Sequence, residues 1–225
     1  TLAEQHLRNL LPSSLMKSMD GFFVQARTNL GSHANNKRER EWLSKVRVVS
    51  TTQPLLPPKI NASVFEEVSN ALYGNRWLKL DYKNAARKTA SIEVMPLGLA
   101  QQGPRLYLVC RYRGYDNERS LALHRILTAE ASSFTFDRPK DFDLQKYDDD
   151  GRFGFGEGKR IRLTFLIEKV SGSYLLESPL SVDQNVTEID DKYEITATVV
   201  ATAQLEWWLR GFGEKICNVR RNAIN

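Results

Sequence analysis

Five short runs between Arg76 and Phe136 alternate apolar and polar residues, and this alternation limits what the chain can fold into. The runs are RWLKLDY, IEVMPLGL, RLYLVCRY, RSLALHRI and SSFTF, and turn-rich connections separate them. Successive side chains of a strand point to opposite faces, so a period of two predicts strands with one buried face. A small, strongly bent barrel of the Sm or SH3 type closes such strands with few exposed edges. The sequence therefore predicts a five-stranded barrel.

The third and fourth runs flank a Gly-Tyr-Asp-Asn turn, which is typical of an antiparallel hairpin. On the third run Arg105, Tyr107 and Arg111 share one face. The opposite face is apolar and suits a core. The hairpin therefore presents one polar face that is suited to contact with a ligand.

The returning run of the hairpin adds more cationic side chains. Arg119 and Arg125 share one parity there, and His124 points the other way, which makes it a secondary candidate. Guanidinium groups donate paired hydrogen bonds to phosphate and carboxylate groups. The arginines and Tyr107 together favour an anionic, nucleotide-like partner.

Composition limits the class of protein further. The chain has 225 residues, 41% of them hydrophobic, and a net charge of +5, which allows real cores and favours contact with a polyanion. No apolar run is long enough for a membrane span, and the beginning of the chain lacks an export signal, so a cytoplasmic location is expected. Cys110 and Cys217 lie in apolar strand-like runs and are expected to be reduced core residues, without a metal or another cofactor.

The remaining segments predict helices and a second mixed unit. Residues 2–31 carry apolar residues at helical spacing, and the proline-rich stretch TTQPLLPP marks a domain boundary. Ile60 to Tyr73 predicts a helix with Asn61 as N-cap and Gly74 as C-cap. Residues 138–158 contain too many Asp and Gly residues for regular structure. After them IRLTFLIEKV, SYLLES, ITATVVA and KICNV predict strands, and AQLEWWLRGFG predicts a helix that ends at a glycine C-cap.

These residues together resemble the WYL-domain transcriptional regulators of bacteria with their C-terminal WCX extension. Leu106-Tyr107-Leu108 corresponds to the Trp-Tyr-Leu motif that gives the family its name. The helix that leads to Tyr82, the strand LYLVCRY, the run RSLALHRI, the F-x-x-P-x-x-F pattern at Phe136, and the WWLRGFG helix follow in the family's order. The resemblance covers roughly residues 60 to 220, and Leu106 departs from it by replacing the aromatic Trp.

The resemblance implies an α+β protein with four parts. These are a helical connector and linker at 1–58, a WYL domain with an Sm-like barrel at 59–142, a connector at 143–158, and a dimerisation-type WCX domain at 159–225. It is closest to the phage-defence subgroup, whose members look like homodimeric repressors with an N-terminal winged helix-turn-helix. That DNA reader is not recognisable in this chain, which we expect to be the sensor and dimerisation part of such a regulator.

The resemblance also implies a ligand at the barrel, with single-stranded DNA or a nucleotide as the expected species. The candidate binding residues share cationic, aromatic or imidazole side chains that suit phosphate and base contacts. They are Tyr82, Arg105, Tyr107, Arg111, Arg119, His124 and Arg125.

Two other functions remain open on the sequence. One is a constitutive nucleic-acid-binding module that uses its barrel as Sm and OB modules do. The other is a hydrolase, which is disfavoured because the chain has no GxSxG elbow and no HExxH motif. The sequence therefore favours a non-enzymatic regulator.

Overall fold

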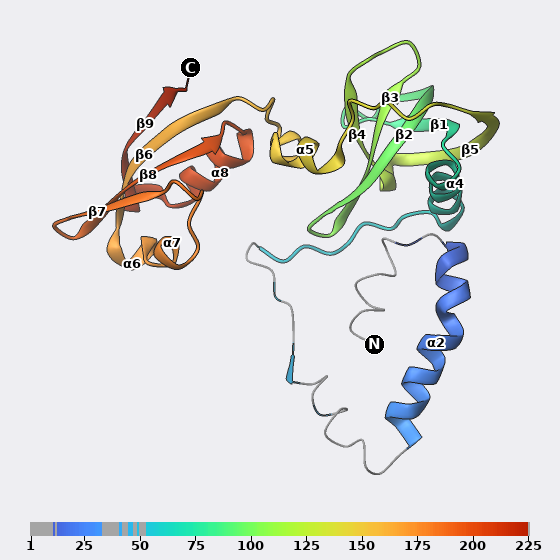
Figure 1. Ribbon diagram of the computed structural model, residues 1–225, viewed down its shortest axis with the longest axis horizontal. Helices are drawn as coiled ribbons and strands as arrows, with labels where there is room; N and C mark the ends of the chain where they lie inside the picture. Colours follow the sequence, from blue (N-terminus) through green and yellow to red (C-terminus); the bar gives the residue numbers. More distant parts are fainter. Residues whose placement is uncertain are drawn as a thin grey trace. The chain divides into compact units, whose positions relative to one another are not determined.

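The chain divides into two compact units in a computed structural model (Figure 1). The structure describes residues 11, 13–32, 41, 45, 46, 49 and 53–224. The first unit extends from Thr1 to Lys140 and the second from Asp141 to Asn225. The four-part division predicted from the sequence stays a prediction.

A long helix and a short one precede the first sheet. Helix α2 extends over Ser13–Ser32, which agrees with the apolar spacing of that segment, whereas the run predicted over residues 2–10 lies outside the described residues. Helix α4 covers Ala62–Tyr73. The Asn61 side chain accepts a hydrogen bond from the Ser63 amide at 3.1 Å, and the amide of Gly74 donates to the Asn70 carbonyl. Both predicted caps of α4 are therefore confirmed.

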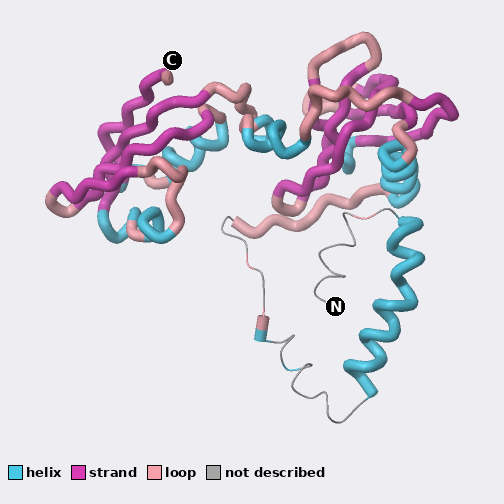
Figure 2. Tube along the Cα trace, in the orientation of Figure 1, coloured by secondary structure: helices cyan, strands magenta, loops and turns pink. Residues whose placement is uncertain are grey.

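The first unit contains a five-stranded antiparallel sheet in the order β4-β3-β2-β1-β5. Figure 2 shows its strands in magenta. Its strands are β1 (Arg76–Lys83), β2 (Thr89–Gln102), β3 (Arg105–Tyr112), β4 (Glu118–Ala122) and β5 (Ile126–Thr135). The five predicted strands are all present, although the fourth ends early at a 3-10 turn, η2 (Leu123–Arg125). Among the described strands no pairing joins β4 to β5. The structure is thus mixed α+β, and closure of this sheet into a barrel stays a prediction.

One face of this sheet builds the core of the first unit against α4. Leu106, Leu108 and Cys110 of β3 are buried there, as their alternation predicts. Helix α4 contributes its own apolar stripe, Val64, Val68 and Ala71. The amide of Ala131 on the edge strand β5 donates to the Glu67 carboxylate of α4 at 2.8 Å. The helix thus covers the sheet and also pairs part of its edge.

The segment from residue 138 to 158 contains more regular structure than its composition predicts. Helix α5 covers Leu144–Asp149, and the Asp143 carboxylate caps it by accepting a hydrogen bond from the Lys146 amide at 2.7 Å. A 3-10 turn, η3 (Arg152–Gly154), follows. The expectation of no regular structure here was therefore wrong, because an aspartate in this segment caps a helix. The assignment of residues 143–158 as a connector stays a prediction.

The second unit begins with α5 and continues in the element order β-α-α-β-β-α-β, with a four-stranded antiparallel sheet in the order β7-β8-β6-β9. Its strands are β6 (Arg160–Glu168), β7 (Asn185–Ile189), β8 (Lys192–Val200) and β9 (Ile216–Ala223). Besides α5, its helices are α6 (Lys169–Gly172), α7 (Tyr174–Glu177) and α8 (Ala203–Gly211), and the 3-10 turn η4 (Gly213–Lys215) precedes the last strand. The prediction of a strand over SYLLES was wrong, because these residues form α7. Helix α8 is confirmed, but its C-cap is Phe212 and not a glycine.

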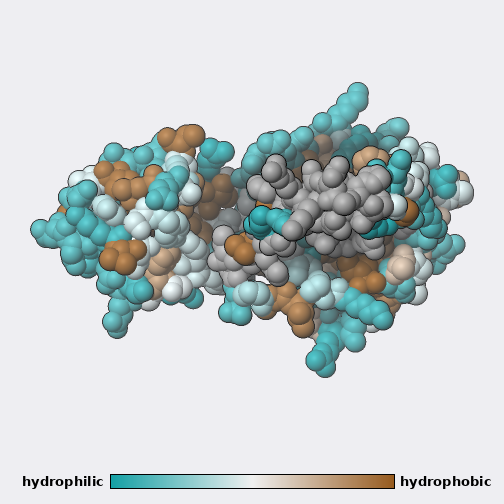
Figure 3. Space-filling view, turned by 90° about the horizontal axis from the view of Figure 1, so that it is seen from below, coloured by the Kyte–Doolittle hydropathy of each residue, from teal (hydrophilic) through white to brown (hydrophobic). Residues whose placement is uncertain are grey.

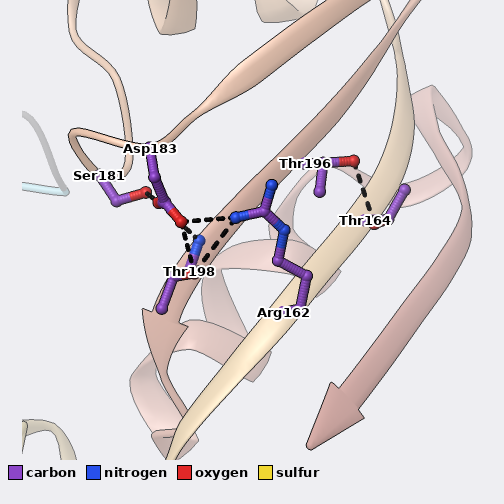
Figure 4. A network of polar contacts seen from close by, with 6 residues as sticks. All are labelled: Arg162, Thr164, Ser181, Asp183, Thr196 and Thr198. Carbon is purple, nitrogen blue, oxygen red and sulfur yellow. Dashed lines mark hydrogen bonds and ion pairs between the residues drawn. The ribbon is translucent and has the colours of Figure 1, made fainter. Parts of the chain in front are cut away.

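The second unit buries its own core and fixes one connection with a carboxylate. Leu163, Phe165 and Ile167 of β6 pack with residues of α7 and α8. On the opposite face of β6, Asp183 accepts hydrogen bonds from Thr198 and pairs with Arg162 (Figure 4). These contacts lower the pKa of Asp183, the hydroxyl groups of Ser181 and Thr198 first. They attach the connection between α7 and β7 to the sheet.

The two cysteines are both free thiols but differ in burial. Cys110 is in the core of the first unit, where burial raises its thiol pKa to about 12. Cys217 is only partly buried and accepts a hydrogen bond from the Lys192 ammonium group at 3.6 Å. The expectation of a core position thus holds for Cys110 alone. None of the described helices is long and apolar enough to cross a membrane.

Candidate anion-binding site

The open end of the β3–β4 hairpin brings Arg105 beside His124 and Arg125. The ladder between β3 and β4 ends at the pair Tyr107–Ala122. Beyond this pair β4 is replaced by η2, which contains His124 and Arg125, and β3 begins at Arg105. Both Arg105 and Arg125 lie close enough to act on the charge of the His124 imidazole.

His124 is the electrostatic centre of this group. Its Nδ1 atom is buried and has no hydrogen-bond partner within the part of the chain that the structure describes. Burial lowers the pKa of His124, and the positive charges of Arg125 and Arg105 lower it further. The imidazole is therefore held neutral next to two guanidinium groups. An anion at this position would pair with both arginines and favour protonation of the imidazole.

The residues of β4 and η2 do not share faces with β3 as strand alternation alone predicts. Odd-numbered residues of β3 pair with even-numbered residues of β4, as in the pairs Tyr107–Ala122 and Arg111–Glu118. Directly paired residues share a face, so Arg119, which pairs with Cys110, lies on the face opposite Tyr107. His124 lies in η2, beyond the last pair, where the charges of Arg105 and Arg125 both act on it. His124 is thus a primary candidate. Arg125 reaches the same group through the 3-10 turn and not through strand alternation.

Tyr107 lies between the two ends of the hairpin on the face that Arg105 occupies. It is partly buried and pairs with Ala100 of β2 and Ala122 of β4. Both paired neighbours have small side chains. Tyr107 is two residues from Arg105 on β3, so the two residues lie on the same face of the strand.

Arg111 is engaged by a neighbouring carboxylate at the turn end of the hairpin. Its Nε and Nη2 atoms donate to Glu118 Oε1 at 2.9 and 2.6 Å. The side chains are only 13% and 20% exposed, which strengthens the attraction relative to a surface pair. Glu118 thus neutralises Arg111, and the structure does not bring this arginine to His124.

Arg119 lies on the opposite face of the hairpin, because it pairs with Cys110. Its guanidinium group stacks over the ring of Tyr112 at 4.5 Å and over that of Tyr115 at 5.6 Å. Tyr82 of β1 packs against the same core edge and acts on the ionisation of Tyr112. Arg119 and Tyr82 therefore form a second cluster with Tyr112 and Tyr115, separate from the Arg105 group.

Sequence reasoning missed the two tyrosines of this second cluster. Tyr112 is the last residue of β3, and burial raises its pKa. Tyr115 is 58% exposed in the turn. The signal was present in the spacing of Tyr112, Tyr115 and Arg119 around the turn, but the strand register is needed to show that these residues meet.

Comparison with known proteins bears on the first unit. Residues 63–131 match the family model described as WYL domain, and no curated protein matches the chain. Among solved structures, proteasome accessory factor B/C (PafBC) of Arthrobacter aurescens is 23% identical, with a TM-score of 0.37, over 76% of this chain and 26% of that chain. A CRISPR Cas-related protein is 12% identical, with a TM-score of 0.44, over 69% of this chain and 45% of that chain. The chain thus spans less than half the length of either protein. The match to the family model covers residues 63–131, and this range includes every candidate residue of both clusters.

Proposed function

We propose that this chain is the ligand-sensing and dimerising part of a DNA-binding transcriptional regulator, a repressor that binds DNA through a winged helix-turn-helix domain. The WYL domain in this proposal binds an anionic ligand, a nucleotide, an oligonucleotide or single-stranded DNA. The observation that carries the proposal is the convergence of Arg105 and Arg125 on His124 within the matched segment. We also propose a role in phage defence, which rests only on the resemblance to that subgroup of WYL regulators.

The chemistry of the Arg105 group suits a phosphate. Two guanidinium groups supply planar donor pairs, and the His124 imidazole supplies a third cation once it takes up a proton. Tyr107, on the same face, has a ring that can stack on a base or a hydroxyl that can donate to a phosphate. Contacts through charge and stacking do not distinguish one base from another. The proposed site should therefore bind nucleotides or oligonucleotides of any base sequence.

The Arg119 cluster favours a second candidate function, a constitutive nucleic-acid-binding module. Tyr115 and Arg119 are exposed and stacked, and exposed aromatic rings with arginine bind single strands without sequence preference. A sensor changes the affinity of the intact regulator for its promoter when ligand binds. A constitutive module binds oligonucleotide without such a change.

The direct test is oligonucleotide affinity of the chain and of an Arg105→Gln, Arg125→Gln double variant, measured by fluorescence anisotropy with labelled oligothymidylate. Each charge-assisted contact contributes about 1.5–3 kcal/mol, so we expect the affinity to fall by at least about 100-fold. The slope of affinity against salt should also decrease.

The matched control is Arg87→Gln, which removes one positive charge from an exposed position in the turn between β1 and β2. It should bind almost as the wild type does. Equal affinity of the double variant and the wild type would remove the site proposed here.

A further inference from the structure

Two exposed aromatic side chains meet on the second unit. Phe155 is 72% exposed and Trp207 is 58% exposed, and their ring centroids are 5.8 Å apart at an interplanar angle of 65°. Large exposed aromatic rings in contact are unusual on a monomer surface and are typical of interaction sites. Figure 3 shows hydrophobic patches among polar residues on this unit. Phe155 and Trp207 are called the aromatic corner below.

The backbone holds Phe155 in place at a conformational cost. Its φ is 60°, in the left-handed region that disfavours residues with a side chain. Its amide donates to the Arg152 carbonyl at 3.2 Å, and the next residue, Gly156, donates to the Gly151 carbonyl at 2.8 Å. A Cβ at Gly151 or Gly156 would lie within 2.7 Å of the Thr202 side chain, so this loop packs directly against the N-terminus of α8. The strained loop presents the ring to solvent and does not bury it, which points to a function outside the unit.

The chain also contains an extended, proline-rich segment, which is a kind of ligand that exposed aromatic rings bind. Residues 53–61 precede α4 and form neither helix nor strand. Proline at 54, 57 and 58 fixes φ and restricts the residue before it to extended conformations, which favours a polyproline II segment. Leu56 in this segment is 93% exposed. Extended proline-rich segments bind surfaces lined by aromatic rings.

Charge agrees with this pairing. Lys59 follows the prolines and is exposed, and Glu157 lies two residues after Phe155 and is exposed as well. A proline segment bound at the corner with Lys59 toward Glu157 would pair the two charges.

We propose that the aromatic corner of one chain binds the proline segment, Pro54–Pro58, of a second copy. Each copy supplies one corner and one segment, so a two-fold dimer contains the contact twice and its interface closes. A segment of five residues spans only about 15 Å, and a single such contact is small for a stable interface. Two linked contacts bind far more tightly than one. This inference rests on the homodimer in the proposed function, and its test measures assembly without any ligand.

The test is sedimentation velocity of the full chain over a concentration series, for the wild type, Trp207→Ala and Leu56→Ser. Both substitutions are at exposed side chains, so the fold should survive, and circular dichroism checks this. We expect a wild-type dimer and a dissociation constant at least about tenfold higher for each variant, since exposed aromatic anchors dominate such interfaces. Val182→Ala, at another fully exposed apolar side chain, should dimerise as the wild type does.

Mixing the two variants distinguishes exchange between copies from a contact within one chain. A pair of Trp207→Ala and Leu56→Ser chains retains one intact contact, in which the first supplies Leu56 and the second supplies Trp207. An equimolar mixture should therefore form more dimer than either variant alone. A monomeric wild type, a Trp207→Ala dimer as stable as the wild type, or a mixture without recovery would each overturn the proposal. Because no ligand is added, none of these results depends on the anion site.

Discussion

The ionisation of one side chain, His124, should control ligand affinity at the proposed site. Burial and then the charges of Arg125 and Arg105 lower its pKa below the ordinary histidine value of 6.5. A bound phosphate favours the protonated imidazole, so binding takes up a proton. Affinity for oligothymidylate, whose diester charge does not titrate in this range, should therefore increase as the pH falls from about 8 to about 5.5, by up to about tenfold per unit. Anisotropy titrations at several pH values measure this.

His124→Gln is the control for this pH dependence. Glutamine retains hydrogen-bonding capacity but cannot take up a proton, so the variant should lose the increase in affinity at low pH. A wild-type affinity that does not change with pH would contradict the assignment. So would a variant that keeps the full dependence, since another group would then take up the proton.

At the scale of single residues, the sequence predicted which types of side chain matter but not which of them meet. Strand alternation alone assigned Arg105 and Tyr107 to one face. The register of β3 with its neighbours agrees, because both residues lie in the regularly paired part of the strand. The same rule misplaced Arg119, because alternation along one strand does not show which face its partner's residues share until the register is known. His124 lies in a 3-10 turn, where strand alternation does not apply. The ion pair of Arg111 with Glu118 likewise depends on the pairing of two strands.

At the scale of elements, the stability of the second unit should depend on glycine at position 151, in the loop before β6, because a larger residue would not fit there. Gly151 has a φ of 68°, and a Cβ there would lie 2.6 Å from Thr202 Cγ2. Gly151→Ala should therefore destabilise the second unit by about 1–2 kcal/mol from the backbone alone, and by more where Thr202 cannot move. Urea unfolding monitored by tryptophan fluorescence measures the change, because Trp207 and Trp208 lie on α8.

Gly211→Ala provides a matched control in the same unit. Gly211 is within α8, and a Cβ there meets no atom within 4 Å. Alanine should stabilise the helix by about 0.5–1 kcal/mol relative to glycine. If the two substitutions shift the urea midpoint in the same direction, the close approach of this loop to Thr202 is not important for stability.

Elements with strong local signals were predictable, and those that depend on distant contacts were not. Helix α4 carries its caps, Asn61 and Gly74, in its own sequence. Strand β7 was missed because it is an edge strand with exposed side chains, so NVTEI has almost no apolar alternation. In α7 only Leu175 is buried, and four residues are too few to separate a helical period from a strand period.

At the scale of the whole molecule, the two units have separate hydrophobic cores. One core is built from α4 and the sheet β4-β3-β2-β1-β5, and the other from β6, β8 and the helices of the second unit. The family match covers residues of the first unit alone. The proposed anion site and the aromatic corner thus belong to different units, and their effects on stability can be measured separately.

This separation predicts where a ligand stabilises the chain. A ligand that binds only the folded first unit should raise the free energy of opening there, by about 2.7 kcal/mol at a hundredfold excess over its dissociation constant. Hydrogen exchange of the full chain with oligothymidylate should therefore slow by up to about 100-fold at buried amides of β1 and β3, and stay unchanged at those of β6 and β8. The Arg105→Gln, Arg125→Gln variant should show no protection in either unit. Protection confined to β6 and β8 would move the oligonucleotide site to the second unit, because mass action stabilises the domain that holds the ligand.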